Sequence, residues 1–383
     1  MSGYFVGYFA GANSIPKLVG KVGHIRVFAA FASMASLSIL IHAVFVDPIV
    51  WTFCRILTGF CLVSIFIVME SWLNDRANNR TRGQLLSIYM FITLIGLSLG
   101  TLLLNFSSPE KYEPFILISL LLSFALIPIL LTKRKAPKFK KLGHIDIKGL
   151  YKTSPLGSVS MFCTGLIHSA LFSLGAVYAA SMNFTIFEIS LLLFLVTVSG
   201  GIFQWPIGYF SDKNDRRIVI IICTFFAAVF CILAIFASGT SLENMYLATN
   251  IGVNKIMFYI YVALYSGMAI PLFTLNLAYV NDYIAKEKFV AAGGGMQIIF
   301  GMGAMMGPFI CSLLMNKYGS NGFFIHLLFF HLIIGVFGLY RITRRTYEDN
   351  PESTFTPLPR NITQLGMELD PTTGADISNT ENK

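Results

Sequence analysis

Long apolar runs alternate with short polar turns along almost the whole chain. Eleven runs of about 17 to 25 mainly apolar residues are bounded by charged or turn-forming residues, and each is long enough to cross a bilayer as a helix. No alternating pattern of the kind found in membrane β-barrels occurs. The predicted spans are 3–19, 27–46, 50–73, 85–106, 114–132, 157–181, 190–210, 218–238, 255–279, 289–315 and 322–341. The pattern therefore predicts an all-α integral membrane protein.

The composition is that of a polytopic membrane protein. Hydrophobic residues make up 55% of the chain and charged residues only 12%, which excludes an ordinary soluble domain. The formal charge of +9 arises from basic residues in the connections between spans, so no nucleic-acid partner is expected. All six cysteines lie inside apolar runs without a metal-binding or redox spacing. We therefore expect no metal, no cofactor and no enzymatic activity.

Basic residues mark one side of the membrane. Lys and Arg cluster in alternate connections, and the other connections carry almost none. By the positive-inside rule the basic connections are cytoplasmic, so the N-terminus is predicted to face outward and the C-terminus inward. The basic connections contain residues 21–26, 76–82, 133–152, 213–217 and 286–288.

The longest basic connection divides the predicted spans into five and six. We predict a first helical bundle over 1–132, a basic cytoplasmic linker over 133–156 and a second bundle over 157–345. The remaining residues, 346–383, hold seven acidic residues, two basic ones and four prolines, with few large apolar residues. This composition predicts a disordered cytoplasmic tail.

A weak internal repeat relates the two predicted bundles. Asn74-Asp75 and Asn281-Asp282 are displaced by 207 positions, and the pairs Gly96/Gly100 and Gly303/Gly307 show the same displacement. Internal symmetry of this kind is typical of transporters whose halves move about a central site. Small residues at a spacing of four also let helix backbones approach closely, although ordinary packing within one bundle explains such pairs as well.

The connection after the predicted seventh span reads Gly208-Tyr-Phe-Ser-Asp212-Lys213-Asn-Asp-Arg216-Arg217. It resembles the signature loop of the major facilitator superfamily of secondary transporters. Further segments resemble its YcaD-like bacterial branch, namely Val22-Gly-His-Ile-Arg26, Glu70-Ser-Trp-Leu-Asn74 and Ala278-Tyr-Val-Asn-Asp282. The resemblance implies twelve helices in two pseudo-symmetric bundles of six, in a bacterial inner membrane. The first family helix is absent from the predicted set, through a misassigned or truncated start or as a true eleven-span variant.

The resemblance also implies a cytoplasmic gate built from the charged loops. Asp212, followed by Lys213, would face the start of the helix that begins near Gly293–Gly295, and Arg216 or Arg217 would pair with Asp282. In the first bundle, Gly23 and Arg26 occupy the corresponding loop, and Arg26 would pair with Glu70 or Asp75. The family further implies that Gly96, Gly100, Gly303 and Gly307 lie at the interface between the halves. The alternative is that the charges only determine orientation.

Polar residues inside spans are the candidates for substrate or proton binding, because a charge at mid-membrane needs a cavity or a partner. Arg55 resembles a family element linked to proton coupling; a position facing the cavity and one reaching the outer surface both remain open. Glu70 is a gate partner or proton acceptor, and His168 is either titratable or structural. Tyr261, Tyr265 and Asn276 share a helix face and are expected to line the cavity.

These features predict a secondary transporter that moves a small organic molecule by alternating access. We expect proton coupling, because Arg55 resembles the coupling element, and a monomer in the lipid bilayer. The Gly307-Pro308 pair favours export, with uptake left open. The alternative is a membrane sensor or regulator that keeps the scaffold without transport, or an inactive truncated transporter.

Overall fold

The computed structural model describes residues 2–78, 80–108, 110–131, 146–238, 251–344 and 353–373, with side chains from residue 255 onward in the fifth of these ranges. Within these ranges all regular secondary structure is helical, and no β-strand is formed. The long helices are α1 (Ser2–Val22), α2 (His24–Val44), α3 (Pro48–Arg76), α4 (Arg82–Leu102), α5 (Glu113–Leu130), α7 (Pro155–Ser181), α8 (Ile186–Lys213), α9 (Arg216–Ala237), α10 (Ile251–Ala269), α12 (Phe289–Tyr318) and α13 (Gly322–Ile342). Shorter helices are α6 (Ile147–Thr153), α11 (Leu272–Asn281), η1 (Leu103–Asn105), η2 (Lys286–Lys288), η3 (Gly319–Asn321), η4 (Gly366–Leu369) and η5 (Pro371–Thr373).

The predicted class, an all-α membrane protein, is confirmed. Each predicted span overlaps a helix, and the ninth is shared between α10 and α11. Nine stretches of the described chain are long and apolar enough to cross a membrane. One of them, 286–342, contains both α12 and α13, and α1 is not among the nine. The count of eleven spans therefore stays a prediction.

The helix boundaries follow from local chemistry. The Asp47 side chain accepts hydrogen bonds from the backbone N–H groups of Ile49 and Val50, each at 2.9 Å, and Pro48 occupies the first position of α3. Gly23 separates α1 from α2 at a φ of 95°, which favours glycine. Pro271 separates α10 from α11, because proline cannot continue the helical hydrogen bonds.

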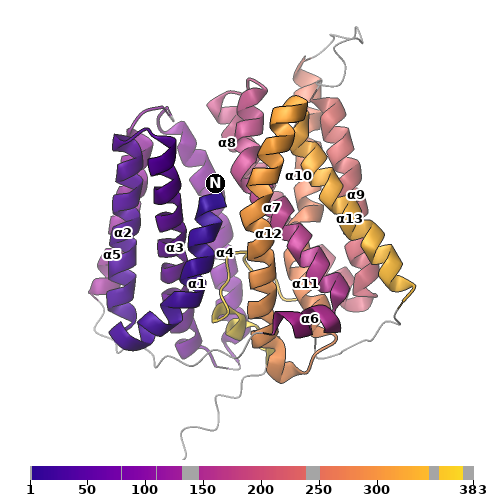
Figure 1. Cartoon of the computed structure of the whole chain (residues 1–383), viewed down its shortest axis with the longest axis horizontal. Coiled ribbons are helices and arrows are strands. Elements are labelled where there is room, and N and C mark those ends of the chain that lie inside the picture. The colour runs from indigo at the N-terminus through magenta and orange to yellow at the C-terminus, as the bar shows by residue number, and fades with distance from the viewer. Residues whose placement is uncertain are drawn as a thin grey trace, which may run out of the picture.

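The helices form two groups, which appear at left and right in Figure 1. In the first group α1 and α2 pack on α3, and α2 also packs on α5. In the second group α7 packs on α12 and α13, while α9 and α10 pack on each other. The groups meet where α1 lies beside α12 and where α4 lies beside α8. We call the end of the molecule that holds α6, the α1–α2 turn and the α8–α9 turn the α6 end (Figure 1).

The four glycines expected at the interface between the halves do not lie there. Gly96 and Gly100 are exposed, and a Cβ added to either would meet nothing within 4 Å. Gly303 and Gly307 approach the backbone of α7 at Phe162 and Leu166, within the second group. A spacing of four permits a close approach but does not require one, as Gly96 and Gly100 show, and it does not specify the neighbouring helix, as Gly303 and Gly307 show.

Residues 353–373, which we call the C-terminal segment, are ordered and mostly buried. The expectation of a disordered tail over 346–383 is wrong for these residues; 345–352 and 374–383 lie outside the described residues. The segment enters from the α6 end and passes between α4 and α12, drawn in yellow in Figure 1. Its apolar side chains explain the order, since Phe355, Leu358, Ile362, Leu365 and Leu369 are all buried. These apolar residues are spaced out along a polar stretch, so the average composition of 346–383 did not reveal them.

The C-terminal segment reaches deep into the helical bundle. Its Arg360 contacts Phe172, which lies 17 residues after the first residue of α7 and therefore about 25 Å along that helix. Irregular backbone at membrane depth is tolerated only where it is enclosed by protein or lines a cavity. The segment satisfies both conditions.

The predicted linker over 133–156 is helical in its second part. Residues 147–153 form α6, which is capped by Asp146 through a 2.9 Å hydrogen bond from the backbone N–H of Gly149. Residues 132–145 lie outside the described residues. In the structure α6 packs on α7 and α12 at the α6 end.

Candidate functional site

A cavity of 1370 Å³ lies between the two helical groups. Its wall is contributed by α1 and α3 on one side, by α7 and α12 on the other, and by the C-terminal segment. Helices of both groups therefore enclose one shared space. Its lining includes Tyr4, Phe5, Tyr8, Lys17, Arg55, Phe66, His168, Phe172, Gln297, Phe300, Arg360 and Asn361.

Arg55 is half-buried and lines this cavity. Close packing of α1 on α3 brings it beside the first turn of α1, because Gly59 lets the Tyr4 carbonyl approach to 1.9 Å of where a Cβ would stand. No carboxylate of the described residues pairs with Arg55. Its guanidinium therefore has no ion-pair partner within the described parts of the protein.

Arg360, a second cation in the cavity, was not among the predicted site residues. Its guanidinium carbon lies 3.3 Å from the centroid of the Phe172 ring. Two bonds fix the backbone around it: the Gln297 side chain donates to the Arg360 carbonyl at 3.1 Å, and the Tyr8 hydroxyl donates to the Asn361 carbonyl at 2.6 Å. Arginine keeps its charge in proteins, so Arg360 adds a second positive charge to the cavity wall.

Glu70 is fully buried, and its carboxylate is held by the C-terminal segment. It accepts hydrogen bonds from the Thr363 N–H at 3.0 Å, the Gly366 N–H at 3.1 Å and the Tyr89 hydroxyl at 2.9 Å. The Thr363 hydroxyl is a fourth donor. Uncharged N–H and hydroxyl groups thus stabilise the buried carboxylate in place of a cation, because several hydrogen bonds to one anion can replace its solvation by water.

The ion pair expected in the first group is not formed. Arg26 is exposed and pairs with neither Glu70 nor Asp75 among the described residues. Asp75 instead lies 3.9 Å from Arg76. The physical reason is the C-terminal segment, because its N–H and hydroxyl groups occupy the acceptor positions of Glu70. Gly23, from the same predicted gate, lies at the edge of the cavity.

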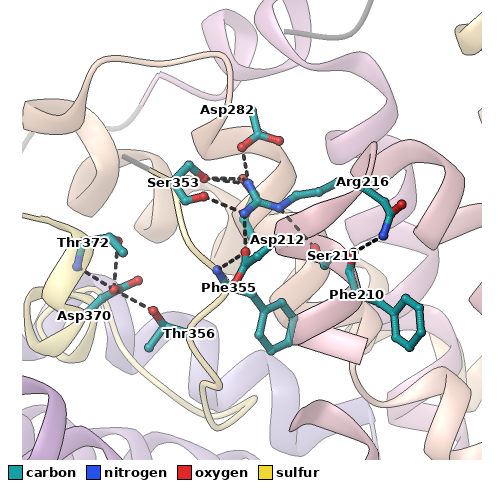
Figure 2. Close-up of polar contacts among 12 residues, drawn as sticks. Phe210, Ser211, Asp212, Arg216, Asp282, Ser353, Phe355, Thr356, Asp370 and Thr372 are labelled. Carbon is teal, nitrogen blue, oxygen red and sulfur yellow. Dashed lines mark hydrogen bonds and ion pairs between the residues drawn. The ribbon is translucent and has the colours of Figure 1, made fainter. Parts of the chain in front are cut away.

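In the second group Arg216 pairs with Asp282, one of the two pairings expected (Figure 2). Its guanidinium also donates to Asp212 at 2.7 Å and to the carbonyl and hydroxyl of Ser353 at 2.6 and 2.9 Å. Arg216 is only 3% exposed, so a buried cation holds two acids and the C-terminal segment together. Arg217 makes a separate pair with Asp215 at 2.6 Å.

The hydrogen bonds of Asp212 in the described residues go to Arg216 and the C-terminal segment, not to the start of α12. Besides Arg216, it accepts a hydrogen bond from the backbone N–H of Phe355 at 2.7 Å (Figure 2). The Phe355 ring packs on Gly208, where an added Cβ would lie 2.3 Å from the ring. Lys213 lies outside this cluster, 4.0 Å from the centre of the Tyr209 ring. The signature loop therefore contacts the C-terminal segment through its glycine, its aspartate and its first arginine.

His168 lines the cavity, as a residue of α7. One ring nitrogen, Nε2, lies 3.0 Å from the Ala269 carbonyl oxygen, and the ring packs edge-on against Phe300 at 5.9 Å between centroids. The carbonyl contact fixes the ring at the junction of α7 with the end of α10. His168 is therefore both a lining residue and a packing residue.

Three residues expected in the cavity lie outside its lining. Tyr261 and Tyr265 pack in the core of the second group, where the Tyr265 hydroxyl lies 3.2 Å from Nε2 of His331. The Asn276 side chain donates to Thr164 at 3.1 Å. The Tyr265 hydroxyl and the Asn276 amide nitrogen thus find partners inside the second group, whereas the buried Asn276 Oδ1 has none among the described residues.

The site residues missed from sequence belong to the C-terminal segment, chiefly Arg360 and Thr363. The usable signal was the spacing of buried apolar residues by three or four positions from Phe355 to Leu369. Among the described residues no group of three or more His, Cys, Asp or Glu side chains could hold a metal ion. All six cysteines are buried and unpaired.

Comparisons with known proteins agree with this architecture. The family model of the Major Facilitator Superfamily matches residues 1–272 and 157–369. An uncharacterized MFS-type transporter of Yersinia enterocolitica is 25% identical over 92% of this chain and 87% of its own length. The uncharacterized MFS-type transporter YcaD of Escherichia fergusonii is 22% identical over 85% of this chain and 81% of its own length. Among solved structures, a mutant of the nucleoside transporter NupG has a TM-score of 0.69 at 14% identity, covering 88% of this chain and 90% of that one.

Proposed function

The chain belongs to the Major Facilitator Superfamily, and we propose that it carries a small amphipathic organic solute across the membrane by alternating access. The observation that supports this proposal is the 1370 Å³ cavity, walled by helices of both groups. A space shared in this way opens to one side or the other when the groups rotate against each other. Residues 1–132 and 157–345 would be the moving halves, joined by 133–156.

The α6 end would face the cytoplasm of a bacterial inner membrane, because the basic connections gather there. In this orientation Arg216 with its two aspartates and the C-terminal segment would hold the two groups together on the cytoplasmic side. Opening this side would require the segment to leave at least one group. It bonds to Glu70 in the first group and to Asp212 and Arg216 in the second.

We assign proton coupling to Glu70. It is a fully buried carboxylate without an ion-pair partner among the described residues, and its protonation would weaken the bonds that hold the C-terminal segment. We assign net export from the Gly307-Pro308 pair in α12. We take the transporter to act as a monomer.

The test measures access to the cavity from each side and needs no knowledge of the substrate. Ser173→Cys introduces a thiol into the cavity lining, and an impermeant maleimide is applied to either face of reconstituted vesicles. We expect the accessible face to change when a pH gradient is imposed. The parent chain gives the background from its six buried cysteines, and Ser312→Cys on the exposed face of α12 is the matched control.

Labelling of the Ser173→Cys variant from one face under every condition would contradict alternating access. That result would favour the sensor, which binds a solute without moving it. Proton flux in the same vesicles tests coupling separately, because Glu70→Gln should abolish the flux while leaving the protein folded.

A further inference from the structure

The cavity carries positive charge without matching negative charge. Lys17, Arg55 and Arg360 line it, and no Asp or Glu belongs to its lining within the described parts of the chain. Removing a guanidinium from water is costly unless a counter-charge is present. The Phe172 ring beneath Arg360 attracts the cation through its π-electrons but does not neutralise the charge.

The two guanidinium groups come from different elements and line the same cavity. Arg55 is on α3 and Arg360 is on the C-terminal segment, and Tyr4 of α1 is part of the same lining. The surrounding wall is aromatic. It is formed by Tyr4, Phe5, Tyr8, Phe66, Phe172 and Phe300.

We propose that the cavity binds an amphipathic organic anion, whose acidic group lies between Arg55 and Arg360 and whose apolar part lies against the aromatic wall. Guanidinium groups suit this task because their fixed N–H groups match the geometry of a carboxylate, sulfonate or phosphate. The C-terminal segment thereby supplies one of the binding residues. The proposal rests on the proposed function in one respect, that the molecule bound is the solute transported.

The alternative hypothesis is that the side chain of Arg360 fills a site meant for a cationic solute. Within the described residues, the lining offers no carboxylate that could pair with such a solute. Aromatic rings can attract an organic cation through their π-electrons, but three basic side chains without a carboxylate in the lining would repel it. The buried acid of the first group, Glu70, is outside the lining and bonds to Tyr89 and to the backbone of the segment. The charge of the lining therefore selects an anion.

Three probes that share one ring system and differ in charge test the proposal. Naphthoate, naphthalenemethanol and naphthylmethylammonium are titrated into the full chain in lipid nanodiscs by calorimetry. We expect naphthoate to bind tightest and the ammonium probe weakest. Arg55→Gln and Arg360→Gln should each weaken naphthoate binding about tenfold or more, the value of a lost charge-assisted hydrogen bond, and leave naphthalenemethanol unchanged.

Arg344→Gln is the matched control. Arg344 also lies over an aromatic ring, Tyr340 at 5.3 Å, but it is exposed at the end of α13 and outside the cavity. Arg360→Lys keeps the charge and should retain part of the preference for naphthoate. Arg55→Gln keeps the test valid if a change at Arg360 displaces the segment, because Arg55 belongs to α3.

Equal binding of the three probes, tighter binding of the ammonium probe, or an equal loss for all probes in the arginine variants would overturn the proposal. Each of these outcomes is independent of the labelling of the Ser173→Cys variant. Failure of the anion preference with alternating access intact would leave the proposed function standing, whereas anion binding without alternating access would indicate a sensor.

Discussion

Glu70 shows how a single buried carboxylate can be stabilised without a cation. Its four donors are two peptide N–H groups and two hydroxyls, and three of them belong to the C-terminal segment. The stability of the buried Glu70 carboxylate therefore depends on the C-terminal segment, and the position of the segment depends on Glu70. Removing either partner leaves the other buried without its hydrogen bonds, which costs more than the bonds contribute when intact.

Glu70→Ala should loosen the C-terminal segment. The N–H groups of Thr363 and Gly366 would lose their acceptor, at about 1 to 3 kcal/mol each if they stay buried. We expect their amide hydrogen exchange to become at least about tenfold faster, because local opening becomes easier. Hydrogen exchange followed by mass spectrometry of peptides from the segment measures the change.

Glu110→Ala is the control for this prediction, since Glu110 is an exposed acid in the loop before α5. It should leave exchange in the segment unchanged. Protection at Thr363 and Gly366 that survives Glu70→Ala would show that apolar packing alone holds the segment.

At the scale of elements, glycine distribution decides which helices touch. Gly7 and Gly59 bring α1 and α3 so close that a Cβ on either would lie less than 2 Å from a backbone carbonyl oxygen of the other helix. Gly165 and Gly303 do the same for α7 and α12, with a carbonyl oxygen 2.2 and 2.1 Å from the added Cβ. These contacts hold each group together internally, and the cavity remains where the groups do not interlock.

Gly59→Ala should therefore destabilise the protein strongly, and Gly100→Ala should not. The first adds a methyl group 1.9 Å from the Tyr4 carbonyl oxygen and forces α1 away from α3, whereas the second adds it where nothing lies within 4 Å. We expect a fall of several degrees in the midpoint of thermal unfolding for Gly59→Ala only. Thermal unfolding in detergent, followed by intrinsic fluorescence, compares the two. Equal midpoints would mean that the α1–α3 contact relaxes easily.

The helices themselves were predictable from sequence, because membrane spans need only length and apolar composition. The Arg216–Asp282 pair was anticipated from the loop motif. Contacts outside this motif were not predictable, as Gly96 and Tyr265 illustrate, because periodicity identifies a face of a helix but not its neighbour. Arg360 was missed because an average over 346–383 hides six buried apolar side chains among prolines and acids.

At the scale of the whole molecule, the C-terminal segment links the two helical groups at the α6 end. It reaches Glu70 and Tyr8 in the first group and Gly208, Asp212 and Gln297 in the second. Such a link favours the closed arrangement by the difference in its contacts between the two states. Any weakening of the link on one group should shift the population toward an open α6 end.

Gly208→Ala tests this shift. The added methyl group would overlap the Phe355 ring at 2.3 Å and expel it from its place on α8. With Ser173→Cys as the reporter, we expect the introduced thiol to react faster with an impermeant maleimide applied at the α6 end. Phe355→Ala alone should raise the rate as well, because it removes the same packing on α8 without an overlap. An unchanged rate in Gly208→Ala would mean that the segment does not control entry.

Three glycines act as sockets for the C-terminal segment. Gly208 receives Phe355, Gly293 receives Met367 and Gly294 receives Gln364, each in the space that a side chain would fill. A relative with a larger residue at these three positions cannot pack a C-terminal segment in the same way. The residues encoded at these three positions should therefore separate the transporters of this branch into those whose C-terminal segment packs inside the helical bundle and those without such a segment.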